Sequence, residues 1–214
     1  MTHTAVPVAL VLLLTGAAAA YEPTLDPRAI DEAIAAGQSR ADAARNRFHQ
    51  AYRVHVGRPP VDDIELVTPF RRVVLDAEAR ARTGDRLYRQ RDALAVAAGF
   101  GNRMQVFVEL TFHPLNTYVG VPSYAVSLAR PGTAVRLNAS DLQRIPRVER
   151  RVAGLPPLPY PVPPAIAAGG PLVGGTVIAT FDGGRLDPRG AYDVIIEETG
   201  TELARVGVNL GAIR

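Results

Sequence analysis

Four polar residues in the middle of the chain have the side chains of a small-ligand site. They are His113, Asn116, Thr117 and Tyr118, and they directly follow a run of alternating apolar residues. A loop at the end of a strand commonly carries binding residues, because the strand holds it in place. Asn and Thr also hydrogen-bond their own backbone in turns, which explains the same residue types. We favour the turn and keep the ligand site as the alternative.

A cationic cluster is the second candidate site. Residues 130–151 contain six Arg and two acidic residues, and the densest part is formed by Arg144, Arg147, Arg150 and Arg151. Such a cluster suits an anionic component of the cell envelope, either a phospholipid headgroup or a lipopolysaccharide. We expect no nucleic-acid partner, because no aromatic residues are interleaved for base stacking. A solvated charged surface is the competing interpretation, and we favour it.

Composition excludes several catalytic mechanisms. The chain has no Cys, and each of its 24 Lys+Arg residues is Arg. Thiolate nucleophiles, cysteine metal sites and disulfides are therefore excluded. The absence of lysine excludes P-loop phosphate binding and Schiff-base chemistry. None of the four serines lies in a G-x-S-x-G motif, although a Ser-His-Asp triad assembled in space stays as an alternative.

Metal binding has equally little support. His49 and His55 are six residues apart, and the chain has no H-x-x-x-H pair. The acidic cluster formed by Asp62, Asp63 and Glu65 lacks the pattern of a calcium loop, so we interpret it as a solvated turn before a helix. We expect no metal and no cofactor.

The first twenty residues are typical of a secretory signal. Ten apolar residues at positions 5–14 are followed by Thr15, Gly16 and four alanines. This run is shorter than the about 20 apolar residues that cross a bilayer, so we expect no membrane span in the mature chain. Without a cysteine at the cleavage position, a lipoprotein is excluded. We therefore expect an exported protein, periplasmic or extracellular, that begins near Tyr21.

Residues 21–103 have helical periodicity. A helix is predicted from Asp26 and Pro27 onward, with a break at Gly37, and a second from Thr68 and Pro69 to Gly84. On the outer face of the second helix, acid-to-base pairs four residues apart favour helix formation. We expect a third helix capped by Asp85.

Residues 104–214 change to the period of two that is typical of strands. Strands are predicted at residues 104–112, 124–128, 134–137, 176–181, 191–197 and 203–210. The last two flank a predicted four-residue hairpin loop at residues 198–201. Ser140 and Gln143 form a capping-box pattern, which predicts a short helical turn ending at Pro146.

Residues 186–192 point to a particular kind of sheet. The sequence LDPRGAY ends in Tyr192 at the start of a strand, which resembles the tyrosine corner of immunoglobulin-like sandwiches. In that motif the tyrosine hydroxyl hydrogen-bonds to backbone a few residues upstream. A Pro-Gly turn before an ordinary strand explains the segment equally well.

A proline-rich segment covers residues 155–164. Proline occupies every second position at Pro157, Pro159, Pro161 and Pro163. One edge of an extended segment would then lack all its N–H donors, so we expect it to close a sheet edge against further strand addition. A stiff spacer between elements is the alternative.

These patterns predict an α+β protein in which an N-terminal helical layer packs on an antiparallel β-sandwich, with immunoglobulin-like character. The leading hypothesis is an exported, non-catalytic binding or scaffolding protein whose ligand is unknown. The alternatives are a small periplasmic hydrolase or metal-dependent enzyme, and a protein that binds anionic lipid or polysaccharide through its arginines.

Overall fold

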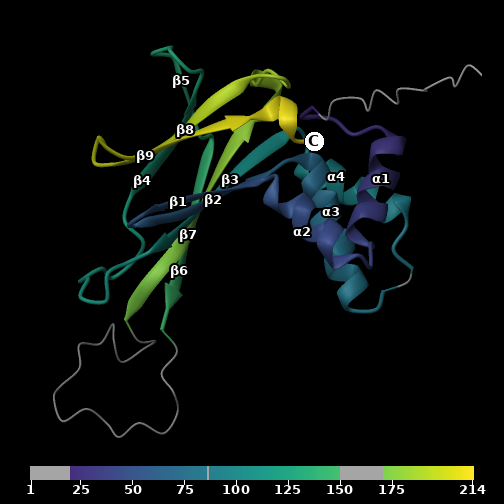
Figure 1. Cartoon of the computed structure of the whole chain (residues 1–214), viewed down its shortest axis with the longest axis horizontal. Helices are drawn as coiled ribbons and strands as arrows, with labels where there is room; N and C mark the ends of the chain where they lie inside the picture. The colour runs from purple at the N-terminus through teal and green to yellow at the C-terminus, as the bar shows by residue number, and fades with distance from the viewer. Residues whose placement is uncertain (1–19, 86, 150–170) are drawn as a thin grey trace, which may run out of the picture.

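The predicted helix starts coincide with observed helices. In the computed structural model, which describes residues 20–85, 87–149 and 171–214, the helices are α1 (Pro27–Gly37), α2 (Asp42–Gln50), α3 (Pro69–Arg82) and α4 (Gln90–Phe100) (Figure 1). The Asp26 carboxylate accepts a hydrogen bond from the N–H of Ala29 at 2.7 Å, and the Thr68 hydroxyl accepts one from the N–H of Arg71 at 3.1 Å. Both predicted caps are therefore present.

The third helix begins later than expected. Asp85 accepts a hydrogen bond from the N–H of Leu87 but does not cap α4. Instead the carboxylate of Asp92 accepts from the N–H of Arg89 at 3.0 Å, at the start of the helix. An acidic side chain in the first helical turn satisfies a donor that the helix itself leaves free.

Three of the helices pack mainly on one another. The apolar faces of α1, α3 and α4 form a small core of their own, which includes Ile30, Val74 and Ala93. Figure 1 shows α1 to α4 with their connections, called the helical unit below, beside the sheets, at the end of β1 (Arg53–Arg58) and β2 (Val61–Val67). The prediction was a helical layer packed on the sandwich. In the structure the apolar faces of these helices pack mainly on one another, and not on a sheet face.

The strands form two antiparallel sheets. One has the order β1-β2-β3-β7-β6 and the other β5-β4-β8-β9. The remaining strands are β3 (Arg103–Thr111), β4 (Tyr124–Ala129), β5 (Arg136–Asn138), β6 (Asp141–Val148), β7 (Leu172–Asp182), β8 (Ala191–Glu198) and β9 (Thr201–Asn209). The mixed α+β class predicted from the sequence is thus present.

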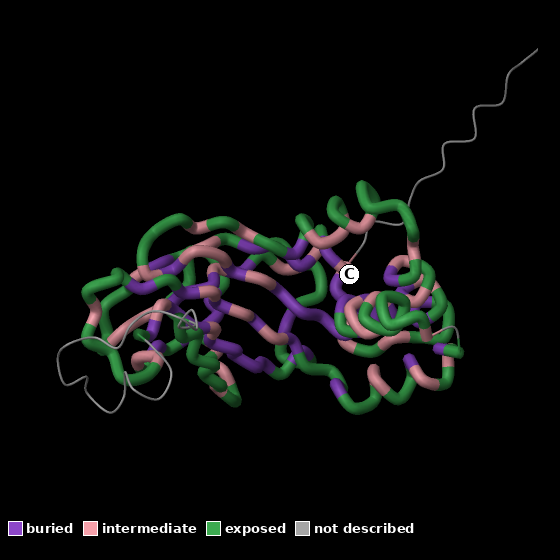
Figure 2. Tube along the Cα trace, turned by 90° about the horizontal axis from the view of Figure 1, so that it is seen from below, coloured by how far each residue is buried: buried purple, intermediate pink, exposed green. Residues whose placement is uncertain are grey.

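The two sheets share one hydrophobic core. Alternate residues of β3 are buried, among them Val106 and Val108, and they belong to the same cluster as Val126 of β4 and Val194 of β8. This alternation follows from the period of two, since successive side chains lie on opposite faces of a strand. Figure 2 shows buried positions recurring along the strands, with exposed residues around them.

The helical region predicted at residues 21–103 also contains a hairpin. Strands β1 and β2 lie within it, and β2 pairs with β3. The acidic cluster therefore lies in a strand, not in a solvated turn. The carboxylate of Asp63 accepts a hydrogen bond from Arg53 at 2.6 Å and lies 3.0 Å from the imidazole of His55. These cross-strand pairs explain how an acidic sequence is accommodated in a sheet.

The predicted helical turn after Ser140 is also wrong. Residues 141–148 form β6, which pairs with β7, and the Ser140 hydroxyl donates to the carbonyl of Thr180 at 3.0 Å. Pro146 fits this strand because β6 is an edge strand, where a missing N–H is tolerated. The proline-rich segment 155–164 lies outside the described residues.

The hairpin between β8 and β9 is tighter than predicted. Glu198 pairs with Thr201, so the loop has two residues, and both Thr199 and Gly200 have positive φ, at 48° and 83°. Two positive φ values at the centre of a two-residue loop are typical of a type I′ turn.

Candidate functional site

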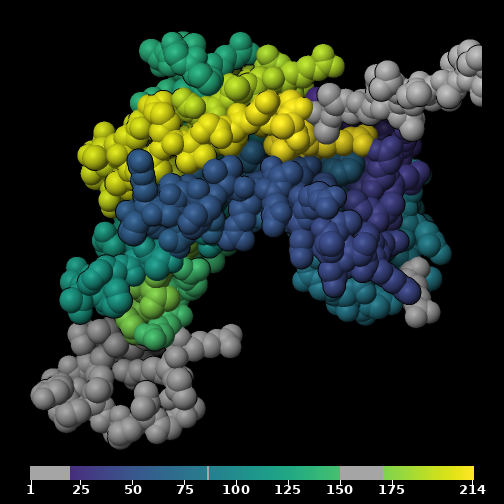
Figure 3. Space-filling view, in the orientation of Figure 1, coloured from purple at the N-terminus to yellow at the C-terminus, as the bar shows by residue number. Residues whose placement is uncertain are grey.

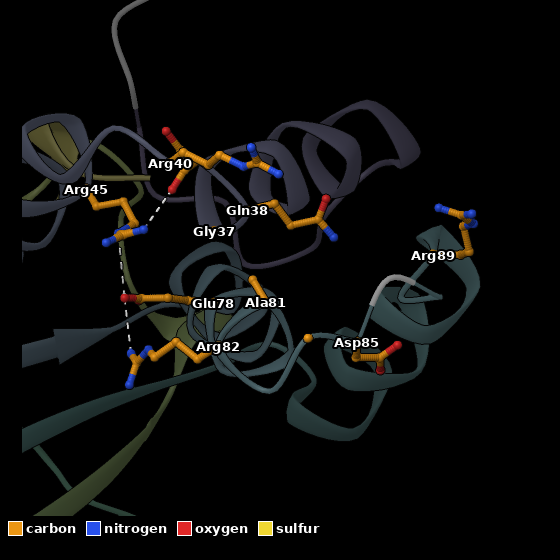
Figure 4. A pocket seen from close by; sticks show the side chains of 11 residues that line it. Gly37, Gln38, Arg40, Arg45, Glu78, Ala81, Arg82, Asp85 and Arg89 are labelled. Atoms are coloured by element: carbon orange, nitrogen blue, oxygen red, sulfur yellow. Dashed lines mark hydrogen bonds and ion pairs between the residues drawn. The ribbon is translucent and has the colours of Figure 1, made fainter.

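A polar cleft lies in the helical unit (Figure 4). Its volume is about 460 Å³, and it is open to solvent. The walls come from the α1–α2 connection, from α2 and α3, and from the connection that follows α3. The charged residues that line it are Arg40, Arg45, Glu78, Arg82, Asp85 and Arg89.

Glu78 is the central acidic residue of this cleft. Its carboxylate lies 3.0 Å from a guanidinium nitrogen of Arg82, 3.8 Å from Nε of Arg45 and 3.0 Å from Nε2 of His49. Burial alone would raise the pKa of Glu78, but the hydrogen bonds and charges of Arg82 and His49 more than offset this and hold the pKa below its usual value. Glu78 is therefore an ionised anchor for the surrounding cations.

Arg45 is held from two further sides. Its guanidinium donates to the carbonyl of Ser39 at 2.8 Å and contacts the carboxylate of Asp42. Its side chain is 29% exposed, so these contacts hold a side chain that is only partly accessible to solvent. Arg82 is attached to the same Glu78 carboxylate, and Figure 4 shows the two arginines on either side of it.

The cleft has an excess of positive charge. Its four arginines and two carboxylates give a formal charge of +2. The guanidinium groups of Arg40 and Arg89 form no ion pair with a side chain of the described residues, and Figure 4 shows them on separate segments, well apart from each other and from the Glu78 carboxylate. Arginine presents five N–H donors in a planar fork that matches carboxylate and phosphate groups. Each of these two guanidinium groups is therefore chemically suited to contact an oxyanion.

The sequence predicts part of this geometry. The pairing of Glu78 with Arg82 four residues later was expected and is present at 3.0 Å. The cleft itself has no sequence motif, because its arginines come from two stretches of the chain, one around residues 40–45 and the other around residues 82–89. Gly37 is the one local signal: a Cβ there would lie 2.8 Å from the Cβ of Ala77, so glycine lets α1 approach α3.

The polar cluster predicted at residues 113–118 forms the start of the β3–β4 connection. The Asn116 amide donates to the carbonyl of His113 at 2.8 Å and to that of Leu172 at 2.9 Å, and its oxygen accepts from the N–H of Tyr118 at 3.0 Å. The Tyr118 ring packs against Phe112 at 5.0 Å. These contacts are those of a side chain that holds a turn, while His113 and Thr117 are exposed.

The same connection exposes large apolar side chains. Leu115 is 82% exposed and Val119 is 93% exposed, on either side of the turn that Asn116 holds. Polar residues were the sequence-based candidates here, and these two apolar neighbours were not singled out. Exposed apolar groups on a fixed loop are a common feature of contact surfaces.

The predicted arginine cluster is not gathered on one face of β6. Arg144 and Arg147 are three residues apart in a strand, so their side chains lie on opposite faces. Arg147 donates to the carbonyl of Leu110 and the hydroxyl of Thr111, both at 2.9 Å, which ties it to β3. Arg150 and Arg151 lie outside the described residues.

Two broader observations complete the description of possible sites. No group of three or more metal-binding side chains occurs within residues 20–85, 87–149 and 171–214. Among the helices in those ranges, none has the length and apolar character needed to cross a bilayer. Comparisons with protein-family models, curated proteins and solved structures found no match.

Proposed function

We propose that the protein is an exported, non-catalytic binding or scaffolding module whose two sheets form an immunoglobulin-like sandwich. The observation that carries the proposal is the strand order. Without β1, the first sheet reads β2-β3-β7-β6 and the second β5-β4-β8-β9. If β2 to β9 are named A, B, C, C′, D, E, F and G, these orders become ABED and C′CFG, as in immunoglobulin-type domains.

The contact made by Tyr192 supports the same proposal. Tyr192 is the second residue of β8, which corresponds to strand F. Its hydroxyl accepts a hydrogen bond from the N–H of Asp187, five residues upstream, at 2.7 Å. A tyrosine at the start of strand F that hydrogen-bonds to upstream backbone is the tyrosine corner of these sandwiches.

The loops at one end of the sheets supply a surface for a partner. Tyr124 pairs with Glu198, so the β3–β4 connection lies beside the β8–β9 turn. Val148 pairs with Leu172, and Thr111 with Gly174, so the end of β6 and the start of β7 lie beside the start of the β3–β4 connection. In immunoglobulin-type domains the corresponding loops commonly bind partners. Figure 3 shows the helical unit at the end of the sheets opposite to the β8–β9 turn.

Photocrosslinking tests the proposed contact surface. A photoreactive residue in place of Leu115 is compared, in the source organism's envelope fraction, with one in place of Leu87, which is 79% exposed but lies in the helical unit. We expect a discrete crosslinked product from position 115 that is weak or missing at position 87. Equal labelling at both positions would contradict a contact surface on this loop.

Export is tested separately by fractionation and N-terminal sequencing of the protein from the same cells. We expect a processed chain that begins near Tyr21 in the periplasm or the medium, because residues 1–20 have the pattern of a cleaved signal. An unprocessed chain in the cytoplasm would contradict this part of the proposal.

A further inference from the structure

Helix α2 is attached to the rest of the protein differently from the other helices. None of its nine residues is buried, whereas α1, α3 and α4 each bury residues in their common core. No side chain of the described residues caps its first turn. Because an isolated helix shorter than about 12 to 15 residues is marginal in water, α2 is helical only while neighbouring elements hold it.

One aromatic ring and two basic side chains hold α2 in place. The Phe48 ring is partly buried and packs beside Phe70, with 6.2 Å between the ring centres. The other contacts are electrostatic: the carboxylate of Glu78 on α3 lies 3.8 Å from Nε of Arg45 and 3.0 Å from Nε2 of His49. The Glu78 side chain is 13% exposed, so salt and solvent screen these pairs less than they screen a surface ion pair.

We propose that α2 is a switch helix, which stays docked on α3 while Glu78 is ionised and undocks as a unit when Glu78 is neutral. Non-helical residues at 38–41 and 51–52 flank it. A few such residues are enough to absorb the backbone change of a hinge. The switch lies in the helical unit, so it goes beyond the sandwich module proposed above and does not depend on it.

The charges around Glu78 make it the controlling group. Among the described residues, the side chains that pair with it are all basic: Arg45 and His49 from α2, and Arg82 from α3 itself at 3.0 Å. Helix α1 approaches this part of α3 through Gly37, which adds no charge. An imidazole is a cation at a pH that protonates a carboxylate, so neutral Glu78 leaves three cations around it. Repulsion then replaces the attraction between α2 and α3.

The pKa of Glu78 sets the pH at which α2 undocks. Burial raises this pKa, but the hydrogen bonds and charges of Arg82 and His49 outweigh burial and hold the pKa below its usual value of 4.5. A carboxyl whose pKa is lowered in the docked state stabilises that state fully above the usual pKa. The contribution is lost as the pH falls through the lowered value. We therefore expect α2 to undock below about pH 4.5.

Hydrogen exchange of the full chain at pH 7 tests the switch without acid. Glu78→Gln removes the charge and keeps the size of the side chain, so it reproduces the neutral state. We expect the amides of residues 42–50 to exchange about tenfold faster than in the unsubstituted protein, while those of α3 and β3 keep their rates. An unchanged rate for residues 42–50 overturns the proposal.

The matched control is Arg82→Gln. This change removes a partner of the same carboxylate, but from within α3, so the contacts of Glu78 with Arg45 and His49 are retained. We expect residues 42–50 to keep their slow exchange. If Arg82→Gln accelerates exchange in α2 as much as Glu78→Gln does, a local disturbance of α3 explains both results and the proposal fails.

A second variant removes the same contacts from the side of α2. Arg45→Gln combined with His49→Gln leaves α3 unchanged, so it provides the test if Glu78→Gln does not fold. Glutamine favours a helix about as well as arginine and better than histidine, so helix propensity cannot explain faster exchange. We expect the same selective acceleration of residues 42–50. Equal acceleration across α1, α3 and α4, or none in α2, contradicts a helix that undocks as a unit.

Discussion

At the residue scale, Arg71 is the least expected side chain of the interior. It is 1% exposed, and its guanidinium donates to the carbonyl of Leu66 at 2.5 Å and contacts the carboxylate of Glu65. The guanidinium also lies 5.0 Å from the centre of the Tyr52 ring. A buried cation is tolerated only with such partners, since desolvation is costly. Arg71 thus joins the start of α3 to the end of β2.

We predict that Arg71→Met lowers the free energy of unfolding by about 3 kcal/mol, because it removes one partner of a buried ion pair and leaves the Leu66 carbonyl without its donor. Denaturant unfolding measures the change. The control is Arg72→Met, at an exposed neighbour on the same helix, where we expect less than about 0.5 kcal/mol. Similar losses in both variants would contradict the role assigned to Arg71.

Local residue signals predicted some contacts well and others not at all. The caps Asp26 and Thr68 were predictable because a cap needs only a short side chain next to the first helical turn. The burial of Arg71 and the central position of Glu78 were not predictable, since their partners lie on other elements. The sequence alone therefore does not indicate the candidate cleft, because it forms only where separate elements come together.

At the scale of elements, Gly37 determines how closely two helices pack. A side chain there would clash with the backbone of Val74 and lie 2.8 Å from the Cβ of Ala77. Helix α1 therefore approaches α3 through a position with no side chain. The same approach brings residues 38–40 to the edge of the arginine-lined cleft.

We predict that Gly37→Ala destabilises the protein by about 1 to 3 kcal/mol, because the added methyl group forces α1 away from α3. Gly99→Ala is the matched control in α4, where a Cβ would meet nothing within 4 Å. That variant should be neutral or stabilising by about 0.5 to 1 kcal/mol, since alanine favours a helix. Thermal unfolding separates the two, and a stabilised Gly37→Ala variant would disprove the close approach.

The β8–β9 turn allows a stabilising substitution. Thr199 has φ of 48°, a region that a β-branched residue rarely adopts. Asparagine is favoured at this position of a type I′ turn, so Thr199→Asn should raise the free energy of unfolding by about 0.5 to 1 kcal/mol. Thr201→Asn, at the neighbouring strand position, should give no gain. A gain at Thr201 and none at Thr199 would show that the turn is of another type.

Strands with regular alternation were predicted, and strands without it were not. In β3, buried and less buried positions alternate along the whole strand. In β2 the pairing shifts between Val61 and Asp63, which breaks the alternation, and acidic residues obscure the rest. In β6 most positions are exposed on both faces, so no apolar period distinguishes the strand from a capped turn. Pairing with strands that are distant in the sequence therefore determines that β2 and β6 form.

At the scale of the whole molecule, Arg214 joins the two parts of the structure. Its carbonyl accepts hydrogen bonds from the hydroxyls of Tyr52 at 2.7 Å and Thr68 at 2.6 Å. Its guanidinium donates to Glu22 at 3.1 Å and lies 4.9 Å from the centre of the Phe70 ring. Residues from the sheet and from the helices therefore share one set of contacts.

The buried tyrosines predict a loss of stability at alkaline pH. Burial raises the pKa of Tyr52 to about 12, and burial also raises the pKa values of Tyr21, Tyr88 and Tyr124. The unfolded chain releases these protons near pH 10, so the contribution is intact below about pH 10 and is lost as the pH rises toward the folded values. Tyrosinate absorbance should therefore rise together with loss of circular dichroism.

The Tyr52→Phe variant is the control, because it removes a titrating hydroxyl and keeps the ring. We expect it to lose stability near neutral pH, where the hydrogen bond to Arg214 is lost, but to decline less steeply above about pH 10. An identical alkaline slope in this variant and in the unsubstituted protein would rule out Tyr52 as a contributor.

The position of α3 and α4 in the chain has a consequence for how this architecture can vary. The chain leaves β2 after Val67 and re-enters the sheet at Arg103, and Val67 lies opposite Gln105 in the ladder. Helices α3 and α4 thus form the connection between β2 and β3, two strands that pair directly with each other. Because a connection between paired strands can be long or short at small entropic cost, the length of this connection can change without altering the strand order. The helices between β2 and β3 can therefore vary while the strand order stays the same.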